Sequence, residues 1–122
     1  MYPSYMREHT YFILLALHGE PLHGYAIAAK AKELSHDRVG LTAGTLYGAL
    51  DRLVSEELIE VDREEKVNGR RRRYYRITET GQAATLEEAH RLQQSLEAAT
   101  TLIGKLPKMP KAPGPGLQGG MA

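Results

Sequence analysis

Two short segments of alternating apolar and polar residues constrain the fold of this chain more than any other feature. Residues 58–63 and residues 71–78 both alternate in the way that half-buried strands do. Between them lies Asn68-Gly69, a dipeptide typical of tight turns between antiparallel strands. The sequence therefore predicts one β-hairpin.

The register of this hairpin follows from which side chains must share a face. A two-residue Asn-Gly loop would set Val61 opposite Arg76, an apolar residue against a charged one. A three-residue loop that begins at Val67 sets Val61 opposite Tyr75 and Ile59 opposite Ile77, which makes one face apolar throughout. We therefore expect the three-residue loop, with its glycine in the left-handed conformation of a bulged hairpin.

Helical patterns surround the hairpin. Apolar residues at helical spacing predict helices at about residues 5–18, 24–35, 43–56 and 78–106. Gly19 is a stop signal for the first helix, and Thr42 and Thr78 are good N-caps for the third and fourth. The predicted fold is mainly α with a small β-hairpin: a winged helix-turn-helix in residues 1–81, followed by a long C-terminal helix.

The third helix has one face made of small residues. Its apolar stripe consists of Leu46, Leu50, Leu53 and Val54, and Gly44, Gly48 and Ser55 gather on the other side, flanked by Thr45, Asp51 and Arg52. A face this small permits close approach to another surface. The helix carries a net charge of −2, counted from Asp51, Arg52, Glu56 and Glu57, so any affinity for DNA must come from close contact and from the hairpin.

The predicted hairpin concentrates positive charge. Six basic residues fall within 11 positions that contain no acid: Lys66, Arg70, Arg71, Arg72, Arg73 and Arg76. Such a cluster can bind phosphates and release counterions, and arginine suits phosphate geometry. The alternative is a charged hairpin that is only solvated.

The last helix carries a heptad-like apolar seam. Its residues recur at steps of three and four: Ala89, Leu92, Leu96, Ala99, Ile103 and Leu106. The helix would be roughly 40 Å long at 1.5 Å per residue, more than a domain of this size can cover. We expect residues 82–106 to form a dimerisation helix, the alternative being that the seam packs on its own domain. Residues 107–122, half of them Pro or Gly, predict a disordered tail.

Composition excludes several classes of protein. The 122 residues contain no cysteine, so no disulfide, thiol nucleophile or Cys-based zinc site is possible, and the five histidines have no metal-ligand spacing. No catalytic motif or phosphate-binding glycine loop is present. We expect no cofactor, no metal and no enzymatic activity. No apolar run approaches a membrane span, and the N-terminus does not look like a secretory signal, so we expect a cytoplasmic protein that does not bind membranes.

Three motifs in this order resemble the PadR family of transcriptional regulators. They are PLHGYAI at residues 21–27, LTAGTLYGALDRL at residues 41–53 and GRRRRYYRITETG at residues 69–81. The resemblance covers about residues 8–105. It implies a winged-helix DNA-binding domain with a single C-terminal dimerisation helix, as in the short-chain branch of that family.

The resemblance also implies which residues contact DNA. It places Thr42, Thr45 and Tyr47 at or near DNA, lets Tyr25 reach the backbone, and matches the arginines of the basic wing, Arg70, Arg71, Arg72 and Arg73. From its place on the small face, Arg52 is a further candidate for base or phosphate contact. The chain departs from many members in having Ala43 and Gly48 where they have proline. It also has no tryptophan, which some short members stack on flat aromatic effectors.

The sequence thus predicts a homodimeric, sequence-specific DNA-binding transcriptional regulator, a repressor, that binds double-stranded DNA at a pseudo-palindromic operator. The expected dimer interface comprises Tyr11, Leu15, Ala89, Leu92, Leu96, Ala99 and Ile103. A gap at its centre, lined by Tyr5, Tyr11, Phe12, Leu15, Leu92, Leu96 and Ala99, would suit a small aromatic or hydrophobic effector; the alternative is a closed interface. The competing function is a winged-helix protein-interaction module whose basic hairpin binds an acidic partner.

Overall fold

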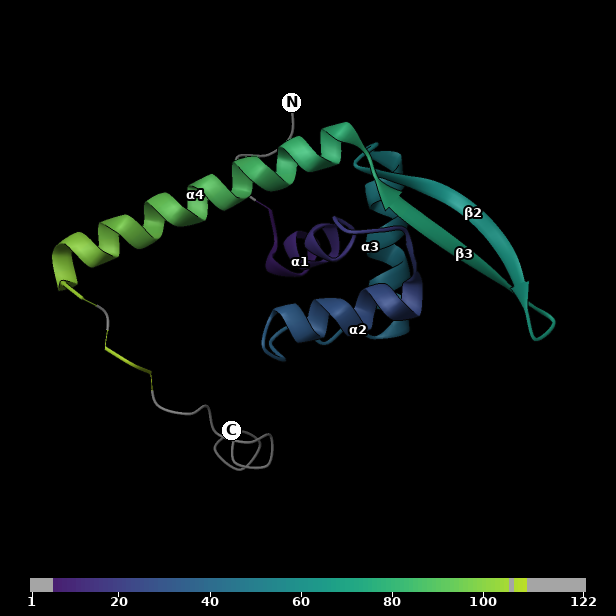
Figure 1. The fold of residues 1–122 in the computed structure, drawn as a ribbon, viewed down its shortest axis with the longest axis horizontal. Coiled ribbons are helices and arrows are strands. Elements are labelled where there is room, and N and C mark those ends of the chain that lie inside the picture. The colour runs from purple at the N-terminus through teal and green to yellow at the C-terminus, as the bar shows by residue number, and fades with distance from the viewer. Residues whose placement is uncertain (1–5, 106, 110–122) are drawn as a thin grey trace. The chain divides into compact units, whose positions relative to one another are not determined.

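The computed structural model describes residues 6–105 and 107–109. It contains α1 (Glu8–Ala16), β1 (Leu22–His23), α2 (Gly24–Leu34), α3 (Ala43–Ser55), β2 (Ile59–Val67), β3 (Arg70–Ile77) and α4 (Glu79–Ile103) (Figure 1). One compact unit ends at Leu92 and a second begins at Gln93. Tyr5, Leu106 and residues 110–122 of the predicted tail lie outside the described residues.

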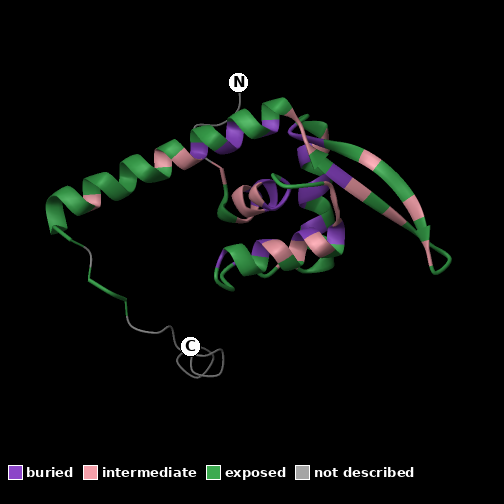
Figure 2. Ribbon diagram, viewed as in Figure 1, coloured by how far each residue is buried: buried purple, intermediate pink, exposed green. Residues whose placement is uncertain are grey.

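The core of the first unit lies where α1, α2 and α3 meet the base of the sheet. Its fully buried members come from each of these helices and from β2, and include Ile13, Leu14, Ile27, Leu50, Leu53 and Ile59 (Figure 2). The predicted apolar stripe of α3 is confirmed, because Leu46, Leu50 and Leu53 are buried and Val54 packs against the cluster. The opposite side of α3 is therefore left exposed.

The hairpin forms with the predicted pairs at its base but not with the predicted loop. Ile59 lies opposite Ile77 and Val61 opposite Tyr75, as expected. The loop, however, has two residues rather than three, because Val67 pairs with Arg70. The extra residue sits in a bulge between Val61 and Arg63 instead.

The turn itself explains why the shorter loop is preferred. Asn68 and Gly69 both have positive φ, +52° and +77°, as the commonest two-residue hairpin turn requires. The bulge at Asp62 then restores the apolar register toward the core. We call residues 59–77, the β2–β3 hairpin, the wing; Figure 1 shows its turn reaching beyond the helices of the first unit.

The sheet has three strands, not the two that the sequence predicts. The additional strand, β1, pairs antiparallel with β3, with Leu22 opposite Tyr75 and His23 opposite Tyr74, so the order is β1-β3-β2. Two residues are too few to show an alternating pattern, which is why the sequence gives no sign of this strand. By this pairing β1 fixes the start of α2 against the base of the wing.

The first and last helices are shorter than expected. α1 ends at Ala16 because the next amide, that of Leu17, bonds back three residues to the Leu14 carbonyl at 3.1 Å, which tightens the last turn before Gly19 is reached. α4 begins after Thr78, whose hydroxyl accepts a hydrogen bond from the Gly81 amide at 3.0 Å, as its predicted N-cap role requires. It ends at Ile103 because Gly104 takes a positive φ of +82°.

Candidate nucleic-acid interface

The exposed face of α3 contains two glycines, Gly44 and Gly48. Packing among the described residues does not require a small residue at either position. Thr42 caps the helix, its Oγ1 accepting a hydrogen bond from the Thr45 amide at 3.2 Å. Among residues 6–105 and 107–109, and apart from the backbone of the helix itself, a Cβ added at Gly44 or Gly48 would meet no atom within 4 Å. Glycine inside a helix is less stable than alanine, and packing within the chain gives no reason for it here.

The start of α2 makes a close contact with a side chain of α3. A Cβ at Gly24 would lie 2.6 Å from the Tyr47 hydroxyl, so the Tyr47 side chain lies directly against the backbone of α2. The neighbouring Tyr25 is 80% exposed and Tyr47 is 47% exposed. Tyr25 and Tyr47 both line one groove beside α3.

His23 supports the same corner. Its Nδ1 accepts a weak hydrogen bond from the Ala26 amide at 3.4 Å, and its ring meets Tyr74 edge-on at 5.4 Å. Burial lowers the pKa of His23, and the nearby Arg72 lowers it further. Both effects favour the neutral ring, the form that can cap α2.

A groove of about 620 Å³ lies between α3, the start of α2 and β3. Its lining residues combine aromatic and basic side chains: His23, Gly24, Tyr25, Tyr47, Asp51, Val67, Asn68, Arg70, Arg71, Arg72, Arg73 and Tyr75. It unites Tyr25, Tyr47 and all four consecutive arginines, which are six of the nine residues predicted to contact DNA. Concentrated positive charge beside polar aromatic groups suits a phosphate backbone.

The arginines of the groove differ in their partners. Arg73 Nε lies 3.2 Å from Glu64 Oε2, and Arg71 Nη1 lies 3.4 Å from Glu64 Oε1. Within the part of the chain that the structure describes, Arg70 and Arg72 form no ion pair. The sequence pattern shows no acid close to the arginines in the chain, but strand pairing brings Glu64 to them from β2.

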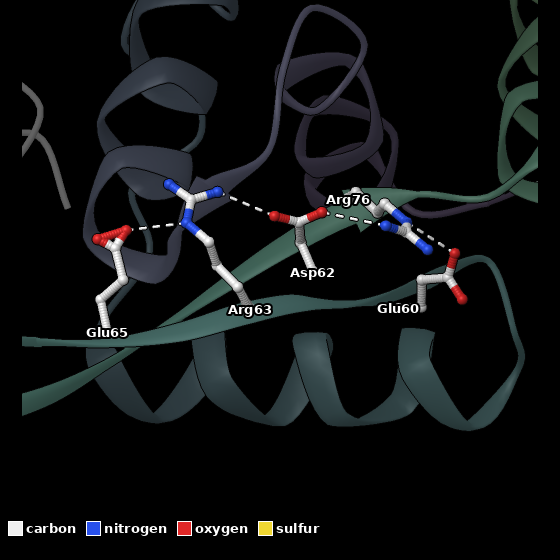
Figure 3. Close-up of polar contacts among 5 residues, drawn as sticks. All are labelled: Glu60, Asp62, Arg63, Glu65 and Arg76. Carbon is white, nitrogen blue, oxygen red and sulfur yellow. Dashed lines mark hydrogen bonds and ion pairs between the residues drawn. The ribbon is translucent and has the colours of Figure 1, made fainter.

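The bulged base of the wing pairs its arginines with its own acidic residues (Figure 3). Arg63 bonds to Asp62 at 2.9 Å and to Glu65 at 2.8 Å, and Arg76 bonds to Glu60 at 2.8 Å and to Asp62 at 3.1 Å. The hydrogen bond from Arg63 and then that from Arg76 hold the pKa of the Asp62 carboxyl below its ordinary value. Arg76, one of the six basic residues of the predicted patch, is thus occupied within the wing.

At the inner end of the groove, Tyr75 is almost fully buried. Burial raises the pKa of its hydroxyl, and the guanidinium of Arg73 partly offsets that rise. The groove therefore ends in a neutral phenol on the core side and opens toward the arginines.

The remaining predicted contacts lie outside this groove. Thr45 lines a smaller pocket together with Glu8, His9 and the loop before α3, and Thr42 lines another beside Tyr25. Arg52 Nη2 lies 3.4 Å from Thr10 Oγ1 on α1. The side chain of Arg52 is thus directed toward α1.

The residues of the predicted dimer interface differ in exposure. Leu92, Leu96 and Ile103 are 41%, 53% and 66% exposed, and Ala89 and Ala99 are half-buried (Figure 2). Tyr11 and Leu15 on α1 are also half-buried. In this single chain the apolar seam of α4 is largely uncovered.

The described residues contain neither a cluster of metal ligands nor a membrane-spanning helix. No three His, Asp or Glu side chains gather there as metal ligands would. No helix in the same ranges combines the length and the apolar character needed to cross a membrane.

Comparison with known proteins identifies the family. The family model described as "Transcriptional regulator PadR-like family" matches residues 13–87. The chain is 40% identical over 63 residues to Transcriptional regulator Rv3488 of Mycobacterium tuberculosis, which covers 52% of this chain and 58% of that protein. It is 44% identical over 78 residues to an uncharacterized 37.1 kDa protein in transposon TN4556 of Streptomyces fradiae, covering 64% of this chain. The chain thus spans 58% and 21% of the lengths of these two relatives.

The fold agrees with a solved member of the same group. A crystal structure of a PadR family transcription regulator from Clostridium difficile R20291 superposes with a TM-score of 0.65 at 25% identity, covering 80% of this chain and all of that one. This agreement confirms the winged-helix architecture, and a family of transcriptional regulators accords with the expectation that the chain is not an enzyme. The matched residues, 13–87, run from α1 through the wing into α4. The chain belongs to the PadR-like family of transcriptional regulators.

Proposed function

We propose that this chain is a sequence-specific DNA-binding repressor that acts as a homodimer on a pseudo-palindromic operator. The observation that carries the proposal is the groove between α3 and the wing, which Tyr25, Tyr47 and four consecutive arginines line. Arginine guanidiniums bind phosphate oxygens with good geometry. The groove thus offers a site for the backbone of a duplex beside α3.

The charges of α3 and of the wing indicate how each contributes to the proposed DNA affinity. Within α3 the charges of Asp51 and Arg52 cancel, and Glu56 and Glu57 follow the helix, so the helix adds shape and hydrogen bonds rather than bulk attraction. The wing supplies the attraction through counterion release. In this proposal Thr42 and Thr45 contact DNA from the N-terminal end of α3, and Arg52 contacts it from the α1 side after leaving Thr10.

The test is selection of duplexes from a random pool by the purified protein. A repressor of this kind enriches an inverted repeat whose half-sites are centred about one helical turn apart, roughly 34–36 Å, or a multiple of it. Binding to the selected duplex must weaken as salt rises. Binding that depends on salt but enriches no sequence would instead favour the protein-interaction module.

The dimer rests on the apolar seam of α4. Three large apolar residues of this seam are exposed: Leu92, Leu96 and Ile103. Their spacing is that of a coiled-coil seam, whose apolar residues are normally buried. A heptad-like repeat of this kind suits packing against the same helix of a second copy of the chain. Tyr11 and Leu15 of α1 complete the proposed interface, which would set the distance between the two copies of α3.

The seam makes a prediction about assembly. Leu96→Glu combined with Ile103→Glu places two charges in the proposed interface, so we expect monomers in light scattering. The matched control is Gln94→Glu with Thr101→Glu, which adds the same charge on the far side of the helix and leaves a dimer. An unchanged dimer in the Leu96/Ile103 variant would rule out the seam.

An effector is the last part of the proposal. The apolar residues of the dimer interface suit a small aromatic or hydrophobic ligand. Its effect on DNA affinity can be no larger than its differential affinity for two spacings of the recognition helices. A thermal-shift screen of flat aromatic compounds, with operator affinity measured for each hit, tests this. Hits that stabilise the protein without changing operator affinity would contradict regulation, and a screen without hits would favour the closed interface.

A further inference from the structure

We propose that Glu64 competes with DNA phosphates for Arg71 and Arg73, and so limits the sequence-independent affinity of the wing. This inference rests on the function proposed above and adds a residue that restrains it. Glu64 is the acid that β2 places against the groove arginines. Its two carboxylate oxygens each hold one guanidinium.

Strand geometry explains why Glu64 is in this position. Side chains alternate along a strand, so Arg71 and Arg73 lie on the same face of β3 as Tyr75, farther from the core. Glu64 pairs directly with Arg73 across the ladder, so it shares that face. The acid thus lies beside the groove, among the groups that would meet a phosphate.

The ion pairs of Glu64 are weak enough to exchange. Its side chain is 36% exposed, and those of Arg71 and Arg73 are 72% and 50% exposed. Ion pairs this accessible to water contribute little to stability. A phosphate that takes one of these arginines must therefore displace only a modest interaction, but it then lies near the Glu64 carboxylate, which keeps only its other arginine. Repulsion between the two anions reduces the gain.

Glu65 provides an internal comparison. It is the adjacent residue on β2, has the same charge, and lies across the ladder from Arg72 on the other face. Its carboxylate bonds to Arg63 at 2.8 Å, within the group of paired charges that Figure 3 shows at the base of the wing. Replacing Glu64 or Glu65 with glutamine raises the net charge by the same amount, but only Glu64→Gln releases arginines that line the groove.

The experiment measures binding of a random-sequence duplex to the parent chain, Glu64→Gln and Glu65→Gln over a range of salt. Each added phosphate contact steepens log affinity against log salt by about 0.9. We expect Glu64→Gln to steepen the slope by about 0.9–1.8 and to bind roughly fivefold more tightly at 0.1 M salt. Glu65→Gln should change the slope by less than about half of one contact. Equal changes in the two variants would overturn the role of Glu64 and show an effect of net charge alone.

A second variant separates competition from a change in the fold of the wing. Adding Arg71→Ala and Arg73→Ala to Glu64→Gln must abolish the gain, because the released groups are then missing. A gain that persists without both arginines would contradict the inference. If the parent chain itself shows no salt-dependent binding to the random or the selected duplex, the proposed function fails; if it binds and the two glutamine variants are equal, only the inference fails.

Discussion

Replacing Gly81 with alanine is expected to destabilise the folded chain by at least about 3 kcal/mol. A Cβ at this position would lie 2.0 Å from the Leu58 carbonyl oxygen and 2.8 Å from Cγ1 of Ile77. The oxygen of Leu58 cannot retreat freely, because it accepts a hydrogen bond from the Thr78 amide at 3.1 Å. The methyl group would therefore push the start of α4 away from the strand pair that it follows.

The control is another glycine of the same chain. In the part of the chain that the structure describes, the Cβ added by Gly44→Ala meets no atom within 4 Å outside the helix's own backbone, so we expect no loss of stability. Urea unfolding followed by circular dichroism compares the two variants with the parent. Equal midpoints for Gly81→Ala and the parent would show that α4 does not pack on Leu58 as described.

Replacing Arg70, Arg71, Arg72 and Arg73 together with alanine is the second large effect. The slope of log affinity against log salt flattens by about 1.8 if Glu64 keeps Arg71 and Arg73 from phosphates, and by about 3.6 if all four arginines each contact one phosphate. Affinity near physiological salt falls roughly thirtyfold or more. The loss should be similar for selected and random duplexes, because phosphate contacts carry no sequence information. Fluorescence anisotropy over a salt series measures both quantities.

A pair of double variants controls for net charge. Arg70→Ala with Arg72→Ala removes two groove arginines that have no ion pair among the described residues, and the slope should flatten by about 1.8. Arg63→Ala with Arg76→Ala removes the same charge from arginines already bonded to Asp62 and its acidic neighbours. This second pair should change the slope much less. The same flattening in both pairs would mean that net charge, and not the groove, governs binding.

Much of the fold could be predicted from local patterns. The apolar stripe of α3, the N-caps Thr42 and Thr78, and the pairing of Val61 with Tyr75 each follow from spacing or from a single side chain. The length of the hairpin loop could not be predicted in the same way. An extra residue in the turn and an extra residue at Asp62 give the same pairing at the base of the hairpin. The alternation of apolar and polar residues there cannot distinguish the two positions.

The site depends more on contacts between distant segments. The run of arginines is visible in the sequence, but its pairing with Glu64 depends on the register of β2 against β3. The contact of Gly24 with Tyr47, and that of Arg52 with Thr10, join segments far apart in the chain. No local pattern reports such contacts, so the sequence identifies which residues are candidates without identifying their partners.

The central claim is that a duplex approaches the small face of α3 closely, and Gly48→Ala tests it most directly. Beyond the helix's own adjacent backbone, no atom of the described residues lies within 4 Å of the added methyl group, so alanine in this helix interior should stabilise the protein by about 0.5–1 kcal/mol. The same methyl group would intrude where DNA is expected, so affinity for the selected duplex should fall roughly tenfold, the scale of one lost base contact. The measurement is duplex affinity and unfolding free energy on the same protein sample. A more stable variant with weaker binding is the predicted result, whereas a more stable variant with unchanged binding would contradict close approach at this face.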